Sequence, residues 1–281
     1  MINGNDNLKI TDNTFARNEG SRIAYYHINS AVKADFWSNH WTINAPTVLK
    51  DLYHHYRYGY RRYEQVQRTF LKHLPREGII LEGGCGLGQY VNALRSRGYN
   101  CIGVDFSSKV VEMVKAIYPD MPVIVDDICR LSGFETGSVA AYISLGVMEH
   151  FQDGPHEALK EALRVLRRNG VLIISVPLAF RWRRLSVHPE GTPLPDNACF
   201  YQYAFAPEEF RDLLINSGFR IQAEYGYALH YAFRLRFKFI RNLLRRFPQL
   251  AHIDLLIDRI PIGVNLARMR LYVAIKEDFD A

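Results

Sequence analysis

Glycines at alternate positions follow an acidic residue in one short segment of the chain. The order is Glu82, Gly84, Gly86 and Gly88. Glycines at the junction of a strand and a helix let the backbone approach a ligand closely and leave the amides of the helix N-terminus free to bind it. A dinucleotide fingerprint would need its third glycine at position 89, where the chain has Gln89. The spacing therefore does not fit a dinucleotide. The segment is either a loop that binds another cofactor or a tight turn without a ligand.

A second acidic residue, Asp105, ends the next apolar run and is followed by Phe106. In a parallel sheet covered by helices, an acid at the end of the second strand can accept hydrogen bonds from both ribose hydroxyls of a nucleoside that lies across the sheet edge. The alternative interpretation of Asp105 is a helix N-cap, because a helical pattern begins shortly afterwards. Asp105 is therefore a candidate ribose ligand.

Five segments, in this order, resemble the motifs of class I S-adenosylmethionine-dependent methyltransferases. They are the glycine segment, Gly103–Ser107, Val125–Ile128, Ser144–Phe151 and Leu166–Leu172. The departures are Gly83, where the family usually has an apolar residue, Val139-Ala140, where Phe-Asp is frequent, and Asn169-Gly170, where Pro-Gly is commoner. None of these departures touches a group that must bind charge.

The resemblance implies S-adenosylmethionine as the cofactor and S-adenosylhomocysteine as its product. It assigns the methionine end to Glu82, Gly84, Gly86 and Gly88, the ribose to Asp105, and the adenine to Asp127 with Ile128; Cys85, Phe106 and Leu145 complete the expected cofactor contacts. For Asp127, the alternative interpretation is a polar turn.

The elements that would position these residues alternate between strand and helix patterns. Strands are predicted over 79–81, 101–104, 123–125, 139–144, 171–176, 220–225 and 269–275, and helices over 89–97, 108–118, 156–167 and 206–217. Such alternation predicts a parallel sheet covered on both faces. The resemblance adds the detail: an α/β, Rossmann-like, seven-stranded, mostly parallel sheet with an antiparallel last strand and helices on both faces.

Two regions extend this domain. Residues 1–75 are rich in aromatic residues and show helical spacing from Thr47 to Leu74, which predicts an N-terminal aromatic and helical cap. Residues 76–281 then form the methyltransferase domain, with a basic helical insertion at about 229–265.

The excess positive charge of the chain gathers in the segment 230–250, which carries six basic residues and no acidic one. The rest of the chain is balanced in charge, which does not favour nucleic acid as a partner. An apolar stripe beside the basic residues favours a lid or an oligomer contact, and the alternative is contact with an anionic membrane surface. No feature of the sequence defines an oligomeric state.

An oxygen nucleophile needs a general base within hydrogen-bond reach, and histidine suits a pH near neutrality. His150, after the fourth strand, is the first candidate, with a structural role beside the cofactor loop as the alternative. His40, between two tryptophans, is the second. Arg181, Arg183 and Arg184 lie in the long loop after the fifth strand, where they either bind a carboxylate or phosphate of the acceptor or are solvated surface charge.

The overall composition is that of a globular protein, with 48% hydrophobic and 23% charged residues. The longest mostly apolar run is too short to span a membrane, and no secretory signal is visible. The four cysteines lie far apart and no metal-ligand cluster is apparent. We therefore expect a cytoplasmic protein without a bound metal, with peripheral contact to a membrane as the alternative.

These observations predict an S-adenosylmethionine-dependent methyltransferase that methylates an oxygen of a small-molecule or lipid-linked acceptor. The acceptor class rests on the segment around Glu149 and His150, which is similar to that of ubiquinone-biosynthesis O-methyltransferases. The alternatives are a nucleic-acid methyltransferase and a non-catalytic partner protein that retains the fold.

Overall fold

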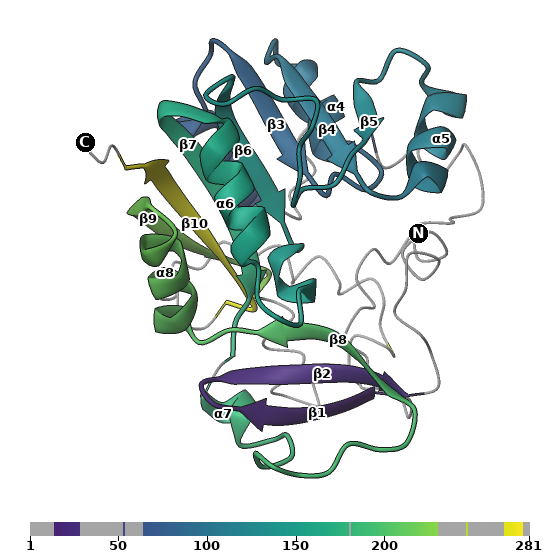
Figure 1. Cartoon of the computed structure of the whole chain (residues 1–281), viewed down its shortest axis with the longest axis vertical. Coiled ribbons are helices and arrows are strands. Elements are labelled where there is room, and N and C mark those ends of the chain that lie inside the picture. Colours follow the sequence, from purple (N-terminus) through teal and green to yellow (C-terminus); the bar gives the residue numbers. More distant parts are fainter. Residues whose placement is uncertain are drawn as a thin grey trace.

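A computed structural model of the chain describes residues 14–28, 53, 64–179, 181–229, 246 and 267–277. The larger of its two sheets has the strand order β5-β4-β3-β6-β7-β10-β9 (Figure 1). Its strands are β3 (Ile79–Gly83), β4 (Cys101–Asp105), β5 (Val123–Val125), β6 (Val139–Leu145), β7 (Leu166–Pro177), β9 (Phe219–Tyr227) and β10 (Met269–Lys276).

The pairing of these strands confirms the predicted fold class. β3 pairs in parallel with β4 and β6, β4 with β5, and β6 with β7, whereas β10 runs antiparallel to both β7 and β9. The central strands are continuous apolar runs because both of their faces are buried. In β6, all residues from Val139 to Ser144 are buried.

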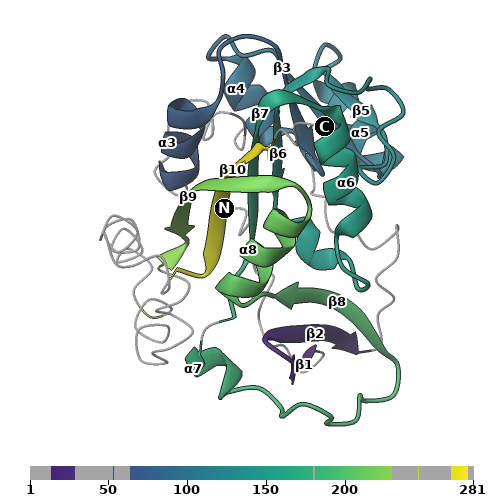
Figure 2. The ribbon, with the colours of Figure 1, turned by 60° about the vertical axis from the view of Figure 1, so that its left-hand side comes forward.

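Helices cover both faces of the sheet (Figure 1 and Figure 2). They are α3 (Glu64–His73), α4 (Gln89–Arg95), α5 (Ser108–Ile117), α6 (His156–Val165) and α8 (Pro207–Asn216). The buried side chains of α6 and α8 belong to one core cluster, and those of α3, α4 and α5 belong to the other. The central strands therefore contribute alternate residues to two cores; in β7, Leu172 and Ile174 face one and Ile173 faces the other.

A second, three-stranded sheet adjoins the large one and was not predicted. It consists of β1 (Thr14–Glu19), β2 (Arg22–Ile28) and β8 (Ala198–Ala204), all antiparallel. In Figure 1 it lies below the large sheet, beside the short helix α7 (Arg181–Arg184). The residues expected to belong to an aromatic, helical cap and to a long loop therefore include strands that pair with each other.

The run Arg22–Ile28 explains this difference. Its β-branched and aromatic residues alternate between two faces that are both covered, so it has the composition of a strand rather than the spacing of an amphipathic helix. Its partner β8 is similarly aromatic, but it lies more than 150 positions away, and local periodicity carries no information about such a pairing.

Several predicted features lie outside the described residues. They include His40 and, except for Leu229 and Arg246, the basic insertion. The helical pattern predicted over 47–74 is described only at Tyr53 and from Glu64 onward, where α3 confirms it. The division at residue 75 stays a prediction. Among the helices that the structure describes, none has the length and apolarity needed to cross a bilayer.

Candidate active site

The glycine segment joins β3 to α4 at the carboxyl edge of the large sheet. Gly84, Gly86 and Gly88 all have left-handed backbones, with φ of 72°, 51° and 67°. Glycine adopts this conformation without the penalty that a Cβ brings. The amides of Gly84 and Cys85 both donate to the carbonyl oxygen of Val104, each at 2.9 Å, so the loop is fastened to the end of β4.

Close packing beneath the loop explains why positions 84 and 103 are glycines. A Cβ at Gly84 would lie 2.5 Å from Cγ2 of Val147, and a Cβ at Gly103 would lie 2.7 Å from Sγ of Cys85. The Cys85 side chain is thus buried between the loop and β4, and burial raises the pKa of its thiol. Any contact of Cys85 with a cofactor would therefore involve its backbone.

Asp105 lies at the end of β4, and its carboxylate is held by two backbone amides. Gly86 donates to Oδ2 at 2.9 Å and Ser107 donates to Oδ1 at 3.0 Å. Burial raises the pKa of Asp105, and these two hydrogen bonds lower it. Each oxygen keeps acceptor capacity for one further donor, as two ribose hydroxyls require.

The helix-cap interpretation of Asp105 does not hold. Ser107 is the N-cap of α5, because its Oγ accepts a hydrogen bond from the amide of Val110 at 3.4 Å. Asp105 ends the strand that precedes this cap.

Glu82 is buried at the base of the glycine loop, and its Oε2 has no hydrogen-bond partner. The pKa of Glu82 is raised to about 8: burial raises it most, the amide of Val91 lowers it, and the charge of Asp105 raises it. An orphaned, buried carboxylate oxygen is costly unless a donor reaches it. The ammonium group of a methionine-derived cofactor is such a donor, so this acid and the glycine loop fit S-adenosylmethionine.

The predicted adenine contacts divide between two environments. Phe106 is 51% exposed and presents an apolar surface at the carboxyl edge. Ile128 is buried in the core, and its Cγ2 would lie 3.1 Å from a Cβ at Gly83. Leu145, the last residue of β6, is half-buried against the other core.

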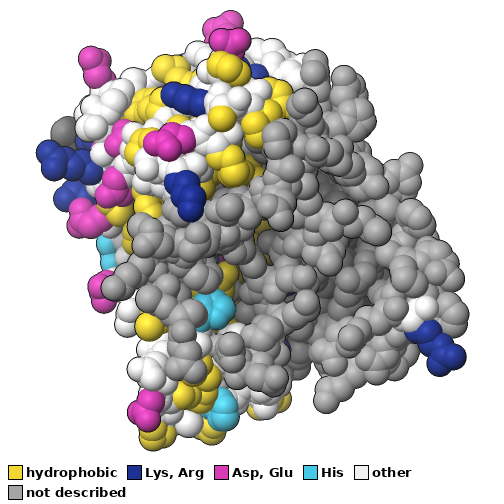
Figure 3. Space-filling view, turned by 90° about the vertical axis from the view of Figure 1, so that its right-hand side faces the viewer, with side chains coloured by type: hydrophobic (Ala, Val, Ile, Leu, Met, Phe, Trp, Pro, Cys, Tyr) yellow, Lys and Arg dark blue, Asp and Glu magenta, His cyan; other side chains and the backbone are white. Residues whose placement is uncertain are grey.

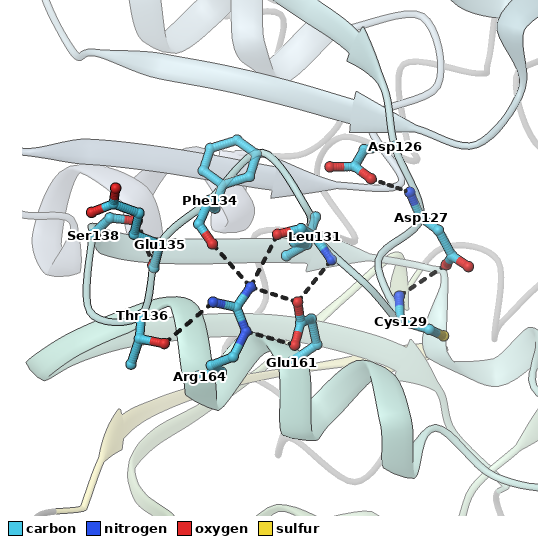
Figure 4. Close-up of polar contacts among 10 residues, drawn as sticks. All are labelled: Asp126, Asp127, Cys129, Leu131, Phe134, Glu135, Thr136, Ser138, Glu161 and Arg164. Atoms are coloured by element: carbon cyan, nitrogen blue, oxygen red, sulfur yellow. Dashed lines mark hydrogen bonds and ion pairs between the residues drawn. The ribbon is translucent and has the colours of Figure 1, made fainter.

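Asp127 is exposed and lies in the polar turn that was its alternative interpretation (Figure 4). Its Oδ1 accepts a hydrogen bond from the amide of Cys129 at 2.9 Å, and its own amide donates to Oδ1 of Asp126. These turn bonds use the amide and Oδ1 of Asp127, and its adenine role stays a prediction.

An ion pair on α6 fixes the segment that follows this turn. Arg164 donates through Nη2 to Oε1 of Glu161 at 2.6 Å and to the carbonyls of Leu131 and Phe134 at 3.0 and 2.9 Å. Glu161 in turn accepts from the amide of Leu131 at 2.8 Å. Figure 4 shows the two side chains reaching from α6 to the loop.

His150 ends the short 3₁₀ helix η2 (Met148–His150), which follows β6. Its Nδ1 lies 2.8 Å from the carbonyl oxygen of Tyr201. A carbonyl only accepts, so this hydrogen bond assigns the proton to Nδ1 and the basic lone pair to Nε2. The geometry is compatible with both interpretations of His150, as a base and as a structural residue.

Three residues that sequence reasoning did not select gather around His150. The ring centroid of Tyr201 lies 5.2 Å from that of His150 and 4.4 Å from that of His27. Glu149 is 3% exposed with no partner for Oε2, and burial raises its pKa to about 8 despite the nearby charge of Arg268. The adjacency of Glu149 to His150 was the only available sequence signal, because His27 and Tyr201 meet through the unpredicted sheet.

Comparison with known proteins identifies the domain. Residues 81–174 match the sequence model of a family described as "Methyltransferase domain". A probable S-adenosylmethionine-dependent methyltransferase of Mycolicibacterium smegmatis is 29% identical over 169 residues, which are 60% of this chain and 62% of that protein. One of Mycobacterium tuberculosis is 30% identical over 163 residues, 58% of this chain and 56% of that protein. The chain thus spans less than two thirds of the length of either relative.

A solved structure supports the fold. It is a complex of the Trm112 methyltransferase activator of Haloferax volcanii with a methyltransferase, which aligns with a TM-score of 0.52 and 18% identity over 88% of this chain and 98% of that chain. The family match places a methyltransferase domain at residues 81–174, and the seven-stranded order with an antiparallel β10 agrees with the fold of class I S-adenosylmethionine-dependent methyltransferases. The cofactor of this class is S-adenosylmethionine. The likeness to ubiquinone-biosynthesis O-methyltransferases stays a prediction.

Proposed function

We propose that this protein transfers the methyl group of S-adenosylmethionine to a hydroxyl oxygen of a small-molecule or lipid-linked acceptor. The observation that carries the proposal is the arrangement at the carboxyl edge of the sheet. There the Asp105 carboxylate and the glycine loop are bonded together, and His150 lies on the segment that follows the neighbouring strand β6.

In this proposal the cofactor is held by residues already described. Asp105 accepts hydrogen bonds from the ribose hydroxyls, and Glu82 accepts one from the ammonium group of the methionine part. Phe106 and Ile128 make apolar contacts with the adenine. S-adenosylmethionine supplies an electrophilic methyl group with a good leaving group, so alignment of the acceptor in a site closed to water accounts for most of the rate.

The remaining task of the chain is to remove the hydroxyl proton of the acceptor. His150 takes it at Nε2, while the hydrogen bond from Nδ1 to Tyr201 holds the ring in place. The aromatic residues of the small sheet, Tyr201 and His27 among them, line the acceptor side of the site and exclude water.

The described residues on one face of the protein give no support to a nucleic-acid substrate. On the face shown in Figure 3, their Lys and Arg side chains are mixed with Asp and Glu side chains. Binding to nucleic-acid phosphates requires clustered positive charge.

Calorimetry with S-adenosylmethionine and S-adenosylhomocysteine tests the proposal. We expect wild-type protein to bind both, and Asp105→Ala or Asp105→Asn to bind about 10- to 100-fold more weakly, because charge-assisted hydrogen bonds to the ribose are lost. Asp120→Ala, an exposed residue in the turn before β5, is the matched control. No binding by the wild type would favour a non-catalytic protein. If the wild type binds, a mass-spectrometric screen with deuterated methyl donor identifies the methylated oxygen.

A further inference from the structure

The side chain of Arg183 is buried but incompletely paired. It is 6% exposed. Its Nε donates to the hydroxyl of Tyr25 at 3.2 Å, and the guanidinium lies 5.8 Å from the centre of that ring. Its Nη2 has no hydrogen-bond partner. Burial of a charged donor without an acceptor is unfavourable, so this arrangement fits a side chain that binds an anionic ligand.

The neighbouring arginines behave differently. Arg184 donates to Oδ1 of Asn18 and to the carbonyl of Gly20, and thereby fastens α7 to the β1–β2 hairpin. Arg17 pairs with Glu19 at 2.8 Å. Among the described residues, no carboxylate pairs with Arg183. Solvated surface charge, the alternative from the sequence, therefore does not describe Arg183.

The location of Arg183 connects it to the proposed methylation centre. Helix α7 follows the end of β7, and so it begins at the same sheet edge as the glycine loop. Tyr25, which holds the guanidinium, shares an apolar cluster with Tyr201. Tyr201 in turn lies against His150. Tyr25 and Tyr201 therefore connect Arg183 with the candidate base through this series of contacts.

We infer that Arg183 binds an oxyanion of the acceptor, and that the acceptor is a hydroxylated molecule carrying a carboxylate or a phosphate. This inference rests on the proposed function. A guanidinium presents donors in a planar fork that matches either oxyanion, and a buried setting strengthens the hydrogen bonds. Tyr25 positions that fork through Nε, and the tyrosine rings contact the apolar body of the acceptor.

Three small probes test the inference in the full chain saturated with S-adenosylhomocysteine: benzoate, phenyl phosphate and the neutral benzamide. Dissociation constants come from calorimetry or ligand-observed NMR. We expect wild type to bind one of the anions about 10- to 100-fold more tightly than benzamide. Tight benzoate identifies a carboxylate acceptor, and tight phenyl phosphate identifies a phosphorylated one.

Substitutions test whether Arg183 causes the preference for an anionic probe over benzamide. Arg183→Gln should remove it and leave benzamide unchanged, Arg183→Lys should restore part of it, and Arg184→Gln should retain it. Tyr25→Phe removes the hydroxyl that accepts the hydrogen bond from Nε of Arg183, and it provides a second test if Arg183→Gln does not fold. A wild type without anion preference, or equal losses in Arg183→Gln and Arg184→Gln, would overturn the inference. Binding of S-adenosylhomocysteine is measured separately, so loss of the cofactor contradicts the proposed function and loss of anion preference contradicts only this inference.

Discussion

The hydroxyl of Tyr142 occupies the space that a side chain at Gly83 would fill. A Cβ at position 83 would lie 2.7 Å from Cζ of Tyr142 and closer still to its Oη. Tyr142 is fully buried on β6, next to β3, and its hydroxyl has no hydrogen-bond partner. The departure of Gly83 from the family pattern is thereby explained: a large residue on the adjacent strand requires a glycine here.

The steric relationship between these two residues predicts strong coupling. We expect Gly83→Ala to lower the free energy of unfolding by about 1–3 kcal/mol, the usual cost of overpacking a core. In a Tyr142→Leu background the same change should cost much less, because the obstructing ring is gone. Urea unfolding of the four proteins measures this double-mutant cycle. Additive effects within about 0.5 kcal/mol would contradict the explanation.

The two buried glutamates predict a stability that falls as pH rises. Burial raises the pKa values of Glu82 and Glu149 to about 8, from 4.5 in the unfolded chain. Between these limits the folded protein binds more protons than the unfolded one, so each group lowers the free energy of unfolding by up to about 1.4 kcal/mol per pH unit.

Urea unfolding of the ligand-free protein at several pH values from 5 to about 8 checks this prediction. Glu82→Gln and Glu149→Gln should each flatten the decline, and the difference from wild type isolates the contribution of that one group. Glu112→Gln, an exposed residue on α5, should preserve the wild-type slope. An unchanged slope in both buried variants would mean that these acids are ionised in the folded protein.

Substitution of His150 by Asn separates its two interpretations. The amide nitrogen of Asn can replace Nδ1 as the donor to the Tyr201 carbonyl, but Asn has no group equivalent to the basic Nε2. With an acceptor found in the screen, we expect kcat to fall about 100- to 10,000-fold and affinity for S-adenosylhomocysteine to stay the same. A variant with full activity would assign His150 a structural role.

The ion pair on α6 predicts a local contribution to stability. Arg164→Ala removes hydrogen bonds to the carbonyls of Leu131 and Phe134 and leaves Glu161 without its ion-pair partner. We expect a loss of about 1–3 kcal/mol and faster hydrogen exchange at the Leu131 amide. Lys160→Ala, an exposed residue on the same helix, serves as the control. Equal exchange in the two variants would show that the loop is held by other contacts.

The sequence predicted the large sheet well because its strands are locally distinctive. A run such as Val139–Ser144 is apolar throughout, since both faces are buried, and the helices between the strands show their own spacing. Asp105 was predictable for the same reason, because its position follows from the end of a strand. Only the structure excludes the cap interpretation, since the hydrogen bond from the amide of Val110 to Oγ of Ser107 depends on backbone geometry.

The acceptor side was less predictable because it depends on pairing between distant segments. Tyr25 and Tyr201 share one cluster only after β2 and β8 have paired. That no carboxylate among the described residues pairs with Arg183 is likewise a property of the folded chain. A sequence pattern can show three arginines in a loop, but it cannot distinguish the buried one from the one that fastens a hairpin.

The small sheet also has a consequence for synthesis of the protein. Tyr25 and Arg183 are 158 positions apart. A ribosome that adds about 5–20 residues per second needs roughly 8 to 30 s to travel between them. An isolated two-stranded hairpin is at best marginally stable in water, so β1 and β2 emerge from the ribosome long before their partner strand exists. During that interval the nascent chain exposes the tyrosines of β2, and chaperones that shield aromatic segments can bind there until β8 has been translated.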